Sequence, residues 1–192
     1  MIRTPIDFML ARDWTGQDPT GMAMSEKYDG VRAMWTGGNL VTRGGNKINA
    51  PAWWLAKLPA GVVLDGELWA GRGKFQMVKG AVRRKAPRDA DWREIKLMVF
   101  DCPLVAAAFS RRYYYIKTTL IENDVLKIVE QQVCFEMNDL YRAFLGVVEN
   151  GGEGLMLRVP SAGYEPWRSG ALQKVKPGKP AVEQFFNNRM AA

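Results

Sequence analysis

Short runs rich in β-branched and aromatic residues recur along the chain, and this pattern predicts β-strands. Two strands are expected within residues 21–45, on either side of a turn at Gly37 and Gly38, with a third short stretch after them. Further runs of the same character occupy residues 62–71, 95–103, 132–137, 154–159 and 172–177. The pattern therefore predicts many short strands.

Two longer segments predict helices. One begins near Ser110, a candidate N-cap, and runs through residues 113–123. The other begins near Asn138 and runs through residues 139–150 to a C-cap at Gly151. Many strands with few helices indicate the α+β class rather than a βαβ repeat. No internal repeat, low-complexity tract or shift in composition marks a linker.

Composition narrows the chemistry that this chain can perform. It has 192 residues, 27 Lys plus Arg against 20 Asp plus Glu, and no histidine. Ser-His-Asp hydrolysis, Cys-His proteolysis, histidine general-base catalysis and His-ligated zinc are excluded. Cys102 and Cys134 are too few for a four-cysteine zinc site and do not suggest a disulfide scaffold. No secretory h-region or membrane span is found, so we expect a cytoplasmic monomer without a membrane partner.

The net charge of +7 is concentrated in one segment. Residues 72–96 contain nine basic and three acidic residues, which accounts for nearly all of the excess. A local basic patch is what phosphate binding requires, but many solvated surfaces look the same. Charge alone leaves a nucleic-acid contact and a solvated face or loop equally open.

The sharpest local feature is the hexapeptide that runs from Lys27 to Arg32, with the sequence KYDGVR. A lysine before an Asp-Gly turn can project into a pocket while the backbone bends away. Lysine is an amine nucleophile, and an arginine close by can hold a phosphate through two hydrogen bonds. Taken alone, the same residues would also suit a hairpin turn with exposed charges.

This hexapeptide resembles the first signature of the covalent nucleotidyltransferases, the superfamily of ATP-dependent DNA ligases, RNA ligases and mRNA capping enzymes. Short segments similar to the other signatures follow in the same order: Thr42-Arg43-Gly44, Asp65-Gly66-Glu67, Phe100-Asp101, Glu153-Gly154 and Lys174-Val175-Lys176. Within the superfamily, the segments MSEKYDGVRA, LDGELWAGRGKF, MVFDCP and EGLMLR are most similar to minimal ATP-dependent DNA ligases of bacteria and phages.

The resemblance implies a nucleotidyltransferase (adenylation) domain with antiparallel sheets flanked by helices. It also implies that Lys27 is the catalytic nucleophile, which attacks the α-phosphate of ATP and forms a lysyl-AMP intermediate. AMP then passes to the 5′-phosphate at a nick in double-stranded DNA, and a 3′-hydroxyl displaces it to seal the strand. None of these steps needs histidine.

The resemblance also assigns the remaining site residues. The residues expected to contact ATP are Glu26, Lys27, Arg32, Arg43, Glu67, Phe100, Lys174 and Lys176. Among these, Phe100 would stack on adenine and Glu67 would accept a hydrogen bond from the ribose. Because hard oxygen ligands suit Mg²⁺, this ion is the expected metal, with Glu153 and Glu67 as its ligands. For DNA contacts we expect Arg43 and, from charge alone, Lys74, Arg83, Arg84 and Lys85.

Most enzymes of this kind continue into an OB-fold domain, but only 16 residues follow Lys176. A five-stranded barrel needs about 25 residues in its strands alone. We therefore expect residues 1–192 to form a single adenylation domain without the OB-fold domain. An RNA ligase remains the alternative enzyme. The non-enzymatic alternative is a module that has the ligase fold and binds nicks or ends.

Overall fold

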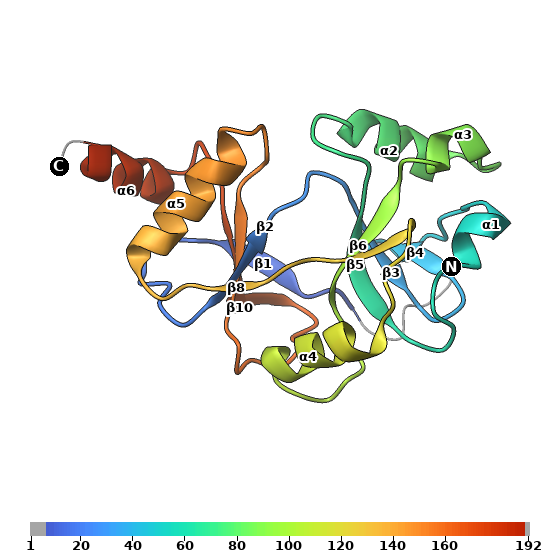
Figure 1. Cartoon of the computed structure of the whole chain (residues 1–192), viewed down its shortest axis with the longest axis horizontal. Coiled ribbons are helices and arrows are strands. Elements are labelled where there is room, and N and C mark those ends of the chain that lie inside the picture. The colour runs from blue at the N-terminus through green and yellow to red at the C-terminus, as the bar shows by residue number, and fades with distance from the viewer. Residues whose placement is uncertain (1–6, 191–192) are drawn as a thin grey trace.

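The structure is a computed structural model that describes residues 7–190. Two five-stranded sheets lie beside each other, with helices on their outer sides (Figure 1). The first sheet has the strand order β1 (Leu10–Asp13), β10 (Arg168–Val175), β9 (Leu155–Arg158), β2 (Ala23–Glu26) and β8 (Gln132–Val133). The second has the order β4 (Leu40–Thr42), β3 (Val31–Trp35), β5 (Leu64–Trp69), β6 (Lys96–Asp101) and β7 (Leu126–Ile128).

Both sheets are mainly antiparallel, and each contains one parallel pair. β1 runs parallel to β10, and β6 runs parallel to β7. The remaining pairs within the sheets are antiparallel, as expected. The predicted α+β class is confirmed.

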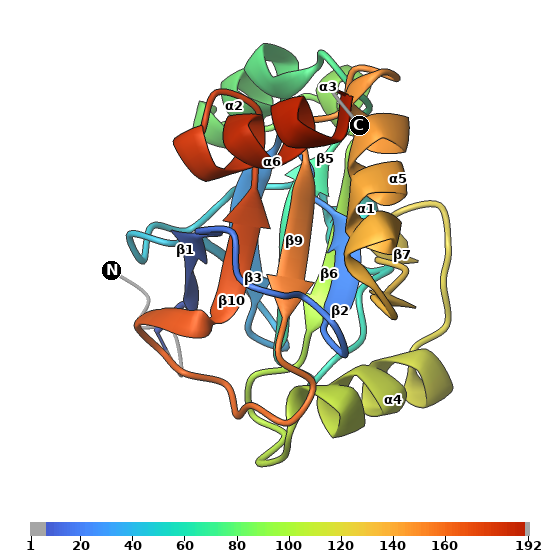
Figure 2. The ribbon, with the colours of Figure 1, turned by 90° about the vertical axis from the view of Figure 1, so that its left-hand side faces the viewer.

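Two helices cover the outer face of the first sheet (Figure 2): α5 (Met137–Val148) and α6 (Pro180–Met190). Alternate residues of the strands point towards these helices, because successive side chains of a strand face opposite sides. Leu155 and Leu157 of β9 and Val175 of β10 therefore join Trp14 and Phe144 in one buried apolar cluster. The other face of the sheet is left for polar side chains.

Helices also cover the second sheet. The elements beside it are α1 (Ala52–Leu55), α2 (Phe75–Arg83), α3 (Asp89–Trp92) and α4 (Phe109–Thr119). Trp54 of α1 and Trp92 of α3 are fully buried and meet edge to face, with ring centroids 4.9 Å apart. They pack with Leu64 and Leu68 of β5, which is how this sheet buries its outer face.

The predicted elements exist, but some of their boundaries were wrong. Residues 21–35 form two strands in different sheets, because the chain crosses from β2 to β3 at residues 27–30. The run at residues 132–137 is a strand only over β8, after which the chain turns into α5. The turn at Gly37 joins β3 to β4 as predicted, and Gly37 has φ 85°.

The helix ends also differ from the prediction. α4 has Ala108 rather than Ser110 at its N-cap. α5 begins at Met137, next to the predicted Asn138, and Glu136 is its N-cap. α5 ends at Val148, ahead of Gly151. The sequence reasoning missed α1, α2, α3 and α6 together with β1 and β7. Among the described residues, no helix is both long and apolar enough to cross a membrane.

Candidate active site

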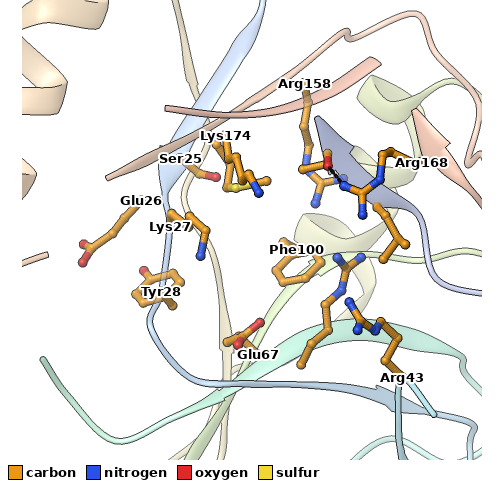
Figure 3. Close-up of a pocket in the computed structure, with 14 residues that line it drawn as sticks. Ser25, Glu26, Lys27, Tyr28, Arg43, Glu67, Phe100, Arg158, Arg168 and Lys174 are labelled. Carbon is orange, nitrogen blue, oxygen red and sulfur yellow. Dashed lines mark hydrogen bonds between the residues drawn. The ribbon is translucent and has the colours of Figure 1, made fainter. Parts of the chain in front are cut away.

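A cavity of about 270 Å³ opens between the inner faces of the two sheets (Figure 3). The side chains that line it come from segments far apart in the chain. The residues that line it are Leu10, Ala11, Ser25, Glu26, Lys27, Tyr28, Arg32, Arg43, Glu67, Phe100, Met156, Arg158, Arg168 and Lys174. Most of the residues predicted to contact the nucleotide are therefore collected in one place.

The alternation of the strands explains this collection. In β5, Leu64 and Leu68 face the helices, so Asp65 and Glu67 face the space between the sheets. In the first sheet, Met156 lies opposite both Lys174 and Ser25 in the strand register. These three side chains form a row across the inner face of that sheet.

Lys27 lies at the point where the chain leaves the first sheet. Its backbone N–H donates to the carbonyl oxygen of Gly154 at 2.9 Å, and its ammonium forms an ion pair with Glu153. The other carboxylate oxygen of Glu153 accepts a hydrogen bond from Nζ of Lys176 at 2.6 Å. Burial raises the pKa of the Glu153 carboxyl, but the ammonium groups of Lys176 and Lys27 outweigh burial and hold this pKa below its usual value.

Two glycines allow the backbones to approach at this site. A Cβ at Gly154, where φ is 139°, would lie well inside van der Waals contact with the carbonyl oxygen of Val175. A Cβ at Gly30 would meet the carbonyl oxygen of Leu68 in the same way and would lie 2.9 Å from Cγ of Glu67. The glycines that follow Asp29 and Glu153 are therefore required by close packing.

Arg32 is fixed by the carboxylate of Asp65. Its Nε donates to Oδ1 at 2.9 Å and its Nη2 to Oδ2 at 2.6 Å. The hydroxyl of Tyr164 also donates to Oδ2 of Asp65, at 2.7 Å. Burial, followed by the charge of Asp65, raises the pKa of Tyr164, so its hydroxyl remains a donor.

Glu67 has a different environment from Asp65. Its carboxylate faces the cavity (Figure 3) and has no hydrogen bond or ion pair to any residue that the structure describes. Burial raises the pKa of Glu67 to about 8, although the positive charges of Arg32 and Lys27 act in the opposite direction. The Glu67 carboxyl is therefore open to a hydroxyl group that enters the cavity, or to a cation that displaces its proton.

Two guanidinium groups lie near the ring of Phe100, and Figure 3 shows that of Arg158. The ring centroid is 5.1 Å from Cζ of Arg32 and 5.0 Å from Cζ of Arg158, within the range of cation–π contacts. Arg158 donates to Oδ2 of the fully buried Asp101 at 3.0 Å, and Arg112 binds both oxygens of the same carboxylate. Burial lowers the pKa of Arg158, and the charge of Asp101 opposes this effect.

The other predicted nucleotide contacts have protein partners as well. Lys174 lines the cavity and pairs with Asp13 at 3.3 Å. Glu26 lies at the edge of the cavity, where its carboxylate binds Arg72 through two hydrogen bonds of 3.1 and 3.0 Å. Lys176 does not line the cavity and reaches the site through Glu153.

The basic residues predicted to contact DNA are not gathered together. Arg43 and Arg83 both line a groove of about 810 Å³ that joins the cavity at Arg32 and Glu67. The others lie away from it: Lys74 pairs with Glu94, Arg84 pairs with Asp91 at 2.9 Å, and Lys85 is an exposed residue outside the groove.

Several residues of the site were missed by sequence reasoning. Arg158 had a usable signal, because it follows Met156 at the spacing that puts two strand residues on one face. Tyr164 and Lys47 had none, since they lie outside the predicted strands and helices. Arg168 begins β10, ahead of the strand predicted at residues 172–177. Lys79 lies in the basic segment 72–96, but the helix that carries it was not predicted. Among the described residues, no three carboxylates or cysteines form a cluster that could hold a metal by themselves.

The chain is similar to proteins of known activity over most of its length. Residues 10–176 match the family described as the ATP dependent DNA ligase domain. A DNA ligase of Haemophilus influenzae is 36% identical over 173 residues, which cover 88% of this chain and 63% of that protein. The chain thus spans less than two thirds of the length of this relative.

Solved structures agree with the sequence match. A structure from a study of Lig E DNA ligases is 35% identical and has a TM-score of 0.80, covering 88% of this chain and 68% of the other. The Chlorella virus DNA ligase-adenylate shares the fold, with a TM-score of 0.72 at 22% identity over 89% of this chain and 67% of the other. By its sequence match over residues 10–176, the chain belongs to the family of ATP-dependent DNA ligases.

Proposed function

We propose that this chain transfers AMP from ATP to its own Lys27, and then to the 5′-phosphate at a nick in duplex DNA, before the strand is sealed. The observation that carries the proposal is the arrangement around the cavity. Lys27 and Glu67 border the cavity. Glu153 forms ion pairs with both Lys27 and Lys176. This is a nucleophile surrounded by groups that can hold phosphate and ribose.

In the first step, the Lys27 ammonium gives up a proton, and Nζ of the resulting free amine attacks the α-phosphorus of ATP. A phosphorus–nitrogen bond forms, the bond to the bridging oxygen of pyrophosphate breaks, and the amine loses a proton. Glu153 already accepts a hydrogen bond from this amine, so its carboxylate is the proton acceptor within reach. Lys174 and Arg32 supply positive charge on either side of the cavity, where the phosphate charge develops.

The other lining residues position the nucleotide. Phe100 provides an aromatic face for adenine, and Glu67 provides an acceptor for a ribose hydroxyl. Transfer to the 5′-phosphate breaks the phosphorus–nitrogen bond and forms a new phosphoanhydride. The 3′-hydroxyl then displaces AMP.

Magnesium fits one part of this site. Mg²⁺ is usually bound through one or two carboxylates, with phosphate and water oxygens completing its ligands. Glu67 has a carboxylate without a protein partner beside the cavity, so it meets this requirement. Glu153 meets it only after releasing Lys27 or Lys176. When bound, the ion would neutralise phosphate charge.

The groove next to the cavity suits the phosphate backbone of DNA. Arg43, Lys47, Lys79 and Arg83 line it, and none of the four forms an ion pair within the described part of the chain. Cations without acidic partners are free to replace the counterions of DNA. The groove joins the cavity at Arg43 and Glu67, so a strand lying in it would bring its end to the nucleotide.

A sealing assay tests the proposal in two stages. The chain is incubated with ATP, Mg²⁺ and a nicked DNA duplex, and separately with a duplex that already carries AMP on its 5′-phosphate. We expect both nicks to be sealed, and only the second to be sealed by Lys27→Ala. Sealing of nicks in RNA alone would favour an RNA ligase. Binding of both duplexes without sealing would favour a nick-binding module.

A further inference from the structure

Arg32 has two carboxylates within reach on the neighbouring strand. In the register of β3 and β5 it lies directly opposite Glu67, where a cross-strand ion pair is the usual arrangement. The guanidinium binds both oxygens of Asp65 instead. As a result, Glu67 faces the cavity without a partner among the described residues.

Asp65 is completely buried, at 0% exposure. A buried carboxylate depends on hydrogen-bond donors from the protein, because it has no water to replace them. Oδ2 of Asp65 receives two donors, Nη2 of Arg32 at 2.6 Å and the hydroxyl of Tyr164 at 2.7 Å. The tyrosine therefore takes part in orienting the carboxylate that holds Arg32.

The hydroxyl of Tyr164 is itself held in place. It accepts a hydrogen bond from the backbone N–H of Met9 at 3.0 Å, just ahead of β1. Tyr164 lies in the loop between β9 and β10 of the first sheet, whereas Asp65 lies in β5 of the second sheet. One hydroxyl thus joins the two sheets at the edge of the cavity.

We propose that Tyr164 is a positioning residue that keeps Arg32 on Asp65 and thereby leaves Glu67 open to the nucleotide. Without the hydroxyl, the buried carboxylate loses a donor and the contact that orients it. Arg32 then turns to Glu67 across the strand and covers the acceptor that the ribose needs. This inference rests on the proposed adenylation of Lys27.

The test is a double-mutant cycle on transfer of label from α-labelled ATP to the protein. We expect Tyr164→Phe to lower kcat/KM by about tenfold, the size expected for loss of a hydrogen bond to a charged group. An Arg32→Lys variant cannot donate two parallel hydrogen bonds to Asp65. In that background, Tyr164→Phe is expected to lower kcat/KM by less than about twofold. Replacing Tyr164 by p-aminophenylalanine restores a donor and is expected to recover the rate.

Tyr113→Phe is the matched control. Its hydroxyl accepts a hydrogen bond from the backbone N–H of Gln131 at 3.2 Å and lies outside the Arg32 pair, so its loss is expected to leave kcat/KM unchanged. An equal loss for Tyr164→Phe in both Arg32 backgrounds, or no loss in either, overturns the inference.

A crystal structure of Tyr164→Phe provides a readout that does not depend on activity. We expect its Arg32 to pair with Glu67, and an Arg32 still bound to Asp65 contradicts the inference. If the unaltered chain takes no label from ATP, the proposed function fails, and the position of Arg32 in this crystal structure still decides the inference.

Discussion

Glu153 forms ion pairs with Lys27 and Lys176, which are far apart in the sequence, and backbone packing brings the two lysines together. Lys27 follows β2 and Lys176 follows β10, and β9 lies between these strands. Gly154 directly precedes β9 and approaches the backbone of Val175 more closely than any side chain would allow. The geometry of the ion pairs therefore depends on a residue that carries no charge.

Replacing this glycine tests that dependence. Gly154→Ala combines a steric clash with a φ of 139°, so we expect a loss of roughly 2–4 kcal/mol in the free energy of unfolding. Denaturant titration measures it, and label transfer from ATP is expected to fall as well. Gly163→Ala is the control, because a Cβ there meets nothing within 4 Å. Equal stability of the two variants would show that the close approach is unimportant.

Sequence reasoning located some residues of the site and missed others for a physical reason. Lys27, Glu67 and Phe100 lie in local patterns whose form is set by nearby residues, and all three line the cavity. Tyr164 acts on Asp65, which lies 99 positions away in the chain. Pairings of that kind are decided by how the sheets meet, which a local pattern does not contain.

At the scale of elements, the basic segment at residues 72–96 contains a helix that its composition did not predict. Residues 75–83 form α2, which the nearby glycines and many charges concealed. The helix buries Val78 and Ala81, and Phe75 and Val82 lie at helical spacing from them. The helix also places two cations on the same side, because Lys79 and Arg83 are four positions apart and both line the groove.

α5 shows how the ends of an element are set by individual side chains. Glu136 and Asp139 form a capping box at its N-terminus, and this feature determines where the helix begins. Oδ2 of Asp139 accepts hydrogen bonds from the backbone N–H groups of Phe135 at 2.9 Å and of Glu136 at 3.1 Å. These bonds hold the pKa of Asp139 below its ordinary value of 3.8.

The cap leads to a prediction about stability and pH. A lowered pKa in the folded state means that Asp139 stabilises the protein above pH 3.8, and that this contribution is lost as the pH falls through the folded-state pKa. We expect Asp139→Ala to lower Tm at pH 7, and the difference from the unaltered chain to shrink in acid. Asp7→Ala, an exposed carboxylate outside any helix, is the control and should show no such difference. A difference that stays constant with pH would contradict the role of the cap.

At the scale of the whole molecule, the cavity exists because the chain crosses between two sheets at residues 27–30. The strand pattern predicted the class of the fold, but it did not separate residues 21–35 into two sheets, because alternation looks the same in either. Membership of a sheet depends on pairing partners, and β2 pairs with β8 and β9 whereas β3 pairs with β4 and β5.

Cations of the groove that form no ion pair are expected to contribute more to DNA binding than cations that are paired with acidic residues. Lys79→Ala with Arg83→Ala removes two groove cations, so affinity for a nicked duplex is expected to fall, and the slope of log K against log salt to shrink by about two. Lys74→Ala with Arg84→Ala removes the same charge from residues that are paired with acids, and should change both quantities less. Equal effects of the two pairs would mean that only net charge matters.

The central claim is that Lys27 carries the nucleotide, and peptide mapping by mass spectrometry tests it most directly. The chain is incubated with ATP and Mg²⁺, digested, and searched for a peptide heavier by one AMP. We predict that AMP is found on Lys27, that GTP gives no such adduct, and that Lys27→Ala carries none. AMP on a different residue, or undiminished adduct in Lys27→Ala, would contradict it.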